Sequence, residues 1–168
     1  MTILEFSDSV LIERTPGEVY AMVSDVTRMG EWSPICKACW WDDPAAGATA
    51  GAWFTGRNET PEGRNGATGE VVPARTWETR SQVVVAEPDR EFAWQVNDGW
   101  VRWGFRLEPA GENGTRLTQH WRFLPKGIAG FGERFGEHAQ DQIALRSDHA
   151  TSGIPVTLAA IKASAEGN

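Results

Sequence analysis

The apolar and polar positions of this chain alternate through its middle and follow a helical period at its end. The first segment, Ile3–Arg14, has the pattern of a strand. Two short helices are predicted directly after it. Thr15-Pro16-Gly17-Glu18 is typical of a helix N-terminus, and Asp25–Trp32 forms a second helical segment that ends before Pro34.

The region between about residues 36 and 124 is predicted to consist of strands. Apolar residues recur at every second position in its last three strands, which is typical of an antiparallel sheet with one buried face. A glycine-rich loop is predicted over Thr60–Gly69. The predicted strands are Lys37–Trp41, Ala52–Glu59, Arg75–Ala86, Phe92–Val96, Val101–Leu107 and Leu117–Phe123.

The last part of the chain, about Gly130–Ala165, is predicted to be helical, with a break or kink at Gly153-Ile154-Pro155. The order is therefore a strand, two short helices, six strands and a long helix. A curved antiparallel sheet folded around one long helix satisfies this order and belongs to the α+β class.

Length and charge narrow the functional classes. A chain of 168 residues favours a single domain over residues 1–168. The net charge is −7, and no basic patch is visible, so neither a nucleic acid nor an anionic membrane surface is the expected partner. The chain shows no signal-peptide pattern and no apolar run long enough to insert in a membrane, which favours a cytoplasmic location.

Five segments resemble the SRPBCC superfamily, which includes START-like, birch-pollen-allergen-like and polyketide cyclase/dehydrase-like proteins. They are Val10–Tyr20, Val23–Val26, Glu31–Pro34, Gly114–Thr118 and Thr157–Lys162. The resemblance covers nearly the whole chain. It implies a helix-grip fold, with a seven-stranded curved sheet around the C-terminal helix and an apolar cavity between them. Many members bind hydrophobic small molecules such as lipids, and some are aromatase/cyclases that act on polyketides.

Tryptophans mark the face that would line such a cavity. The chain has nine of them, and Trp94, Trp103 and Trp121 occupy the apolar face of three successive strands. Trp53 joins them if its strand has the same phase. Rigid aromatic walls suit an apolar ligand, but the same residues would also suit a packed core. Both interpretations stay open from the sequence.

Polar residues on the same faces are the next candidates. Gln119 falls between apolar residues, and a buried amide without a partner costs about 1–3 kcal/mol. His138 and Gln142 share a helical stripe with Phe135. They would orient a ligand hydroxyl or carbonyl if they face the cavity, and otherwise they lie in solvent. The candidate ligand-binding residues are Trp53, Trp94, Trp103, Gln119, Trp121, Phe135, His138 and Gln142.

Catalysis has little support in the sequence. It contains no nucleophile elbow, phosphate loop or His-Glu-x-x-His zinc motif. If the protein is an enzyme, His138 is the candidate acid or base, with Arg57 or Arg80 polarising a carbonyl. His120 and His149 are expected at the surface. The leading prediction is a hydrophobic ligand-binding protein, with a polyketide aromatase/cyclase and a protein-interaction module as alternatives.

Cys36-x-x-Cys39 raises the question of a metal or redox site. Structural zinc needs further ligands that the sequence does not place nearby, and residues three apart in a regular strand point to opposite faces. Structural or incidental cysteines are therefore predicted, with no metal and no cofactor, and any role of Cys36 and Cys39 stays open. The ligand is expected to enter between the C-terminal helix and the Thr60–Gly69 loop. Its identity and the choice between monomer and homodimer stay open.

Overall fold

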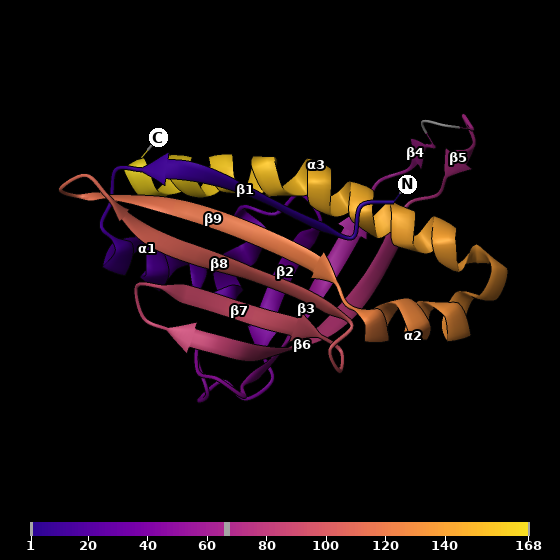
Figure 1. Cartoon of the computed structure of the whole chain (residues 1–168), viewed down its shortest axis with the longest axis horizontal. Coiled ribbons are helices and arrows are strands. Elements are labelled where there is room, and N and C mark those ends of the chain that lie inside the picture. Colours follow the sequence, from indigo (N-terminus) through magenta and orange to yellow (C-terminus); the bar gives the residue numbers. More distant parts are fainter. Residues whose placement is uncertain (1, 66–67, 168) are drawn as a thin grey trace.

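The computed structural model describes residues 2–65 and 68–167, and Figure 1 shows its architecture. Within these ranges, seven strands form one antiparallel sheet in the order β1-β9-β8-β7-β6-β3-β2. A long C-terminal helix runs along this sheet beside β1 (Figure 1). The predicted α+β helix-grip fold is confirmed.

The strands match the predicted alternation closely. The seven strands of the main sheet are β1 (Glu5–Ile12), β2 (Cys36–Trp41), β3 (Trp53–Thr60), β6 (Arg75–Glu87), β7 (Glu91–Val96), β8 (Val101–Ala110) and β9 (Gly114–Phe123). The predicted loop Thr60–Gly69 carries one strand of a small hairpin, β4 (Gly63–Arg64) with β5 (Val71–Val72). Residues 66 and 67 of this loop lie outside the described residues, and its role in admitting a ligand stays a prediction.

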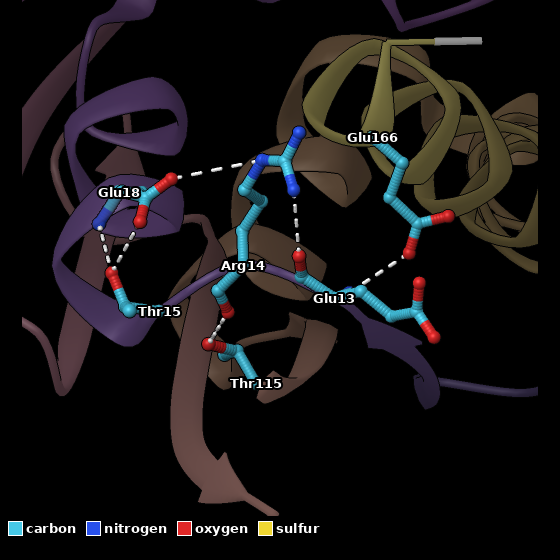
Figure 2. Close-up of polar contacts among 6 residues, drawn as sticks. All are labelled: Glu13, Arg14, Thr15, Glu18, Thr115 and Glu166. Atoms are coloured by element: carbon cyan, nitrogen blue, oxygen red, sulfur yellow. Dashed lines mark hydrogen bonds and ion pairs between the residues drawn. The ribbon is translucent and has the colours of Figure 1, made fainter. Parts of the chain in front are cut away.

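Two short helices follow β1, as predicted. Helix α1 (Pro16–Val23) begins at Thr15, whose side chain accepts a hydrogen bond from the Glu18 N–H at 3.3 Å. The Thr15 hydroxyl in turn donates to the Glu18 carboxylate at 3.1 Å (Figure 2). A 3-10 helix, η1 (Val26–Glu31), begins at Asp25, whose carboxylate accepts from the Thr27 N–H at 3.1 Å. Local capping chemistry therefore fixes both helix starts.

The C-terminal helices differ from the prediction. Their bounds are α2 (Pro125–Phe135), η2 (Gly136–His138) and α3 (Ala139–Glu166). The expected break at Gly153–Pro155 is wrong, because α3 continues through Pro155, whose ring is exposed. The chain turns instead at Gly136, whose φ of 54° favours glycine. Helix α2 consequently folds back beside α3 (Figure 1).

The C-terminal end of α3 is tied to the turn between β1 and α1 (Figure 2). The Glu13 N–H donates to the Glu166 carboxylate at 2.8 Å, and Lys162 donates to the same carboxylate at 2.9 Å. Nearby, the Thr115 hydroxyl donates to the Arg14 carbonyl at 2.7 Å. The Glu13–Glu166 bond, with one from Lys162 to the Leu11 carbonyl at 2.6 Å, holds this end of α3 against the sheet, while residues nearer the start of α3 border the cavity described below.

Candidate ligand-binding cavity

A cavity of about 260 Å³ lies between the inner face of the sheet and α3. Side chains from η1, α2 and α3 complete its lining. Small-molecule pockets usually measure about 300–1,000 Å³, so this cavity suits a compact ligand. No helix in the described ranges is long and apolar enough to cross a bilayer.

Aromatic rings from four strands form one side of the cavity. Strand register places Trp94 directly opposite Trp103, and Trp103 directly opposite Trp121. The Trp94 ring also lies 5.8 Å from Phe54 and 6.0 Å from Phe105, measured between ring centroids. We call these five residues the aromatic wall. Their rings meet in tilted or edge-to-face contacts, which gives a rigid apolar surface.

Several buried polar groups interrupt this apolar lining, and those of Gln119 and Trp32 stand out because they lack a hydrogen-bond partner among the described residues. Gln119 and Trp32 both line the cavity, and each is only 6% exposed. The side-chain oxygen of Gln119 and the indole N–H of Trp32 have no hydrogen-bond partner among the described residues. A buried polar atom left in this state costs about 1–3 kcal/mol. Gln119 therefore offers an acceptor to a bound molecule, and Trp32 offers a donor.

The two cysteines lie together on the cavity side of β2. An irregularity in the register between Cys36 and Ala38 reverses the alternation, so that Cys36 and Cys39 both line the cavity. This corrects the expectation that they face opposite ways. Their Sγ atoms are 3.2 Å apart. Gly56 on the neighbouring strand makes space for the two sulfur atoms, because a Cβ at this position would crowd Cys39 Sγ at 3.2 Å.

The thiol pair is polarised, and no third metal-ligating side chain accompanies it among the described residues. The hydrogen bond between the thiols lowers the pKa of Cys36, and the same bond, followed by burial, raises the pKa of Cys39. Across residues 2–65 and 68–167, no group of three or more His, Cys, Asp or Glu side chains could hold a metal ion. The pair is chemically a buried dithiol that borders the ligand space.

A second group of cavity residues places two arginines and a histidine around one tryptophan ring. Arg75 and Trp77 come from β6, and Arg146 and His149 come from α3. The guanidinium carbons of Arg75 and Arg146 lie 5.1 Å and 5.0 Å from the Trp77 ring centroid. The His149 ring stacks on Trp77 at 6.1 Å. We call these four residues the arginine cluster.

Burial and neighbouring positive charges lower the pKa values of Arg146 and His149. Burial, followed by the charges of Arg75 and Arg134, lowers the pKa of Arg146 to about 10. Burial, followed by the charge of Arg146, also lowers the pKa of His149. At neutral pH the cluster therefore combines two guanidinium cations with a neutral imidazole.

The structure brings half of the candidate ligand-binding residues to the cavity. Trp94, Trp103, Gln119 and Trp121 line it, as the strand alternation predicted. Trp53 instead lies outside the lining, beneath Arg80, whose guanidinium carbon is 4.3 Å from the Trp53 ring centroid. Phe54, the next residue along β3, occupies the inner face in its place.

The turn at Gly136 moves the helical candidates away from the cavity. Phe135 ends α2 and packs on Phe131 at 5.1 Å. His138 lies in η2 with its side chain 70% exposed, so it is not placed to act as an acid or base in the cavity. Gln142 lies outside the lining but accepts a hydrogen bond from Arg75 at 3.3 Å.

Other sequence expectations about polar residues also change. Arg80 pairs with Asp42 at 2.7 Å and is 58% exposed, and Arg57 is 50% exposed, so neither polarises a group inside the cavity. His149 was expected at the surface but lines the cavity. His120 was expected in solvent but is buried against Gly104, and burial lowers its pKa to about 4. No pattern in the neighbouring sequence indicated that Arg75 and Arg146 would both lie over Trp77.

The fold and the cavity define a helix-grip protein with an internal pocket between sheet and helix. The chain belongs to the family described as polyketide cyclase/dehydrase and lipid transport, whose sequence model matches residues 4–146. A polyketide-cyclase-like protein from Corynebacterium glutamicum, solved by solution NMR, is 48% identical with a TM-score of 0.64. The similarity covers 96% of this chain and 91% of that chain.

More distant solved structures share the fold. A START superfamily protein from Mycobacterium smegmatis is 16% identical with a TM-score of 0.54, covering 88% of this chain and 99% of that one. The di-domain aromatase/cyclase StfQ of the steffimycin biosynthetic pathway is also 16% identical, with a TM-score of 0.62. The match covers 98% of this chain and 51% of StfQ, which has two domains. No curated protein matches the sequence.

Proposed function

We propose that this protein binds a compact hydrophobic molecule, lipid-like or aromatic, in the cavity between the sheet and α3. The observation that carries the proposal is the aromatic wall, which faces open space rather than closing onto α3. Family membership supports it, because the family description names both polyketide chemistry and lipid transport. Binding would derive from contact of the ligand with rings that are already in place.

The affinity expected from such a cavity is moderate. Burying roughly 200 Å² of apolar ligand surface contributes about 5 kcal/mol at ~25 cal/mol per Å², before the cost of association. Pre-ordered rings keep that cost low, since few side chains must be immobilised. Trp94, Trp103 and Trp121 would supply most of the contact. Gln119 and Trp32 would orient a ligand hydroxyl or carbonyl through their unpartnered polar atoms.

The first experiment asks whether anything occupies the cavity. Native mass spectrometry of freshly purified protein is compared with its denatured mass, and excess mass that disappears on denaturation identifies a copurifying ligand. Binding of a neutral probe, 2-naphthamide, is then measured by calorimetry. A saturable 1:1 complex is expected. Absence of both a copurifying molecule and probe binding would contradict the proposal.

A cavity-filling variant makes this test specific to the site. Val96 lines the cavity, so Val96→Phe should fill part of it and weaken naphthamide binding at least about ten-fold. The matched control is Val156→Phe, because Val156 lies on α3 outside the lining and is 53% exposed. Equal binding by both variants would show that the probe sits elsewhere.

One observation favours a polyketide cyclase as a second candidate function. His149 borders the cavity, and its lowered pKa keeps the imidazole neutral at pH 7 and able to accept a proton. Arg75 and Arg146 beside it would stabilise an enolate oxygen formed in a cyclisation. Turnover of a polyketide-like substrate that is lost in His149→Gln, with binding retained, would support this role. Unchanged turnover in that variant would exclude it.

A further inference from the structure

Arg75, Arg134 and Arg146 line the cavity without a carboxylate partner among the described residues, and two of them, Arg75 and Arg146, lie over the Trp77 ring. Neither Arg75 nor Arg146 forms an ion pair with a carboxylate of the described residues, although most other arginines of the sheet do pair with a carboxylate. Arg75 donates to the neutral oxygen of Gln142. Among the described residues, Arg146 has ring contacts alone, with its guanidinium carbon 5.0 Å from the Trp77 ring centroid and 5.8 Å from that of Phe131. Stacking satisfies the guanidinium faces but not its N–H groups.

The unsatisfied group lies inside the lining. The Nη1 atom of Arg146 is buried without a hydrogen-bond partner among the described residues. Leaving a charged donor in this state costs more than leaving a neutral one. The chain as a whole carries a net charge of −7, so the positive potential here is a local feature and not part of a general basic surface.

Acidic residues that also border the cavity do not neutralise the two arginines. Asp25 accepts hydrogen bonds from the Thr27 N–H and hydroxyl, which fixes its carboxylate at the start of η1. Glu78 borders the cavity but is exposed, and it forms no ion pair with Arg75 or Arg146. Arg134 adds a further positive charge near Arg146.

The geometry points to a ligand that is a hydrophobic acid, with its apolar body against the aromatic wall and its carboxylate bound by Arg146 and Arg75. This inference rests on the proposed function and adds the chemical class of the ligand. The guanidinium fork suits a planar carboxylate, to which it can donate two parallel hydrogen bonds. Phe131 lines the cavity next to Arg146, 5.8 Å from its guanidinium carbon, and its ring packs at 5.9 Å on Trp100, which also lines the cavity, so aromatic lining reaches the cluster.

Gln142 has a supporting position in this arrangement. Its side-chain oxygen accepts from Arg75 Nη1 at 3.3 Å, which orients the guanidinium without neutralising it. A glutamate at the same position would pair with Arg75 and compete with the ligand. Gln142→Glu should therefore weaken binding of an acid while leaving a neutral ligand unaffected.

The test uses two matched pairs of probes that differ in charge: 2-naphthoate with 2-naphthamide, and decanoate with decanamide. Dissociation constants are measured by calorimetry at pH 7.5 for the native sequence and for Arg146→Met. The native protein should bind at least one acid about ten-fold or more tighter than its amide. In Arg146→Met the ratio should fall to about one, because the amide keeps its affinity and the acid loses it.

Controls separate charge from folding. Arg122→Met makes the same substitution on an exposed arginine of β9 outside the cavity and should leave the ratio unchanged. Arg146→Lys keeps the charge without the fork and should retain part of the preference, which also covers the case that Arg146→Met fails to fold.

The outcomes distinguish this inference from the function on which it rests. Equal binding of acid and amide by the native protein would overturn the acid class and leave the cavity function intact. A preference that persists in Arg146→Met and Arg146→Lys alike would also overturn it. Saturable binding of none of the four probes would count against both proposals.

Discussion

The aromatic wall and the arginine cluster border the same cavity but stand in different relations to the rest of the protein. The rings of the wall contact one another at 5.8–6.4 Å, so folding itself supplies their partners. The arginines of the cluster have no carboxylate partner within the described residues, and one buried N–H group is unpaired. The wall thus stabilises the fold, whereas the unpaired N–H group of Arg146 costs free energy that the proposed acid would recover on binding.

The largest expected effect is on the wall. Trp94 is 5% exposed and contacts three other rings, so Trp94→Ala should lower the free energy of unfolding by about 3–5 kcal/mol. Urea unfolding followed by circular dichroism measures it. Trp40→Ala is the control, because Trp40 is 41% exposed and should cost less than about 1 kcal/mol. Similar losses in both variants would contradict the wall's structural role.

A second prediction concerns the dithiol beside the wall. A ligand in the cavity should protect Cys36 and Cys39 from alkylation, by about ten-fold at nine-tenths occupancy, with acids and amides equally protective at equal occupancy. Cys36 should react first, because the hydrogen bond from Cys39 lowers its pKa. Mass spectrometry with iodoacetamide measures both. Unchanged reactivity at saturation would place the ligand elsewhere.

Truncating Arg146 should not lower the free energy of unfolding, in contrast to truncating Trp94 in the wall. Arg146→Met removes a buried cation and keeps an apolar stem, so the free energy of unfolding should stay the same or rise by about 1 kcal/mol in the absence of ligand. Urea unfolding measures it, with Arg122→Met as the exposed control. A loss above about 1 kcal/mol would mean that the folded protein itself, rather than a ligand, satisfies Arg146.

The smallest expected effect is a pH dependence of acid binding. The pKa of His149 lies below its ordinary value of 6.5 because of burial and then Arg146, with Arg75 lowering it further and Asp148 raising it. A bound carboxylate would raise this pKa, so the complex takes up protons and affinity for the acid increases about three-fold as pH falls below 6.5. Calorimetry at several pH values checks it. The role of His149 would be contradicted if His149→Gln kept the same pH dependence of acid binding, or if the amide showed an equal pH dependence.

Strand alternation predicted much of the wall because its determinants are local. A period of two placed Trp94, Trp103 and Trp121 on one face, and the antiparallel order then brought them into register. The same rule failed at Trp53, because Ala52-Trp53-Phe54 are all apolar and give no phase. It also failed at Cys39, because the irregularity in β2 after Cys36 leaves no trace in the hydrophobic pattern.

The arginine cluster could not be predicted from neighbouring residues. Arg75 and Arg146 belong to elements far apart in the sequence, and they meet only because α3 packs along the sheet. The turn at Gly136 added a second error, since a continuous helix would have put Phe135 and His138 on the same stripe as Gln142. His138 lies in solvent and His149 lines the cavity, and this difference follows from where the fold places each residue rather than from their identical chemistry.

The tryptophan indole N–H signals offer the most direct test that a ligand occupies the cavity. The nine tryptophans divide between the cavity lining (Trp32, Trp77, Trp94, Trp100, Trp103 and Trp121) and positions outside it (Trp40, Trp41 and Trp53). A ¹H–¹⁵N spectrum titrated with 2-naphthoate, assigned through Trp→Phe variants, should show saturable shifts in the first group and little change at Trp40 and Trp53. Shifts confined to Trp40 and Trp53, or no saturable shift at all, would contradict binding in the cavity.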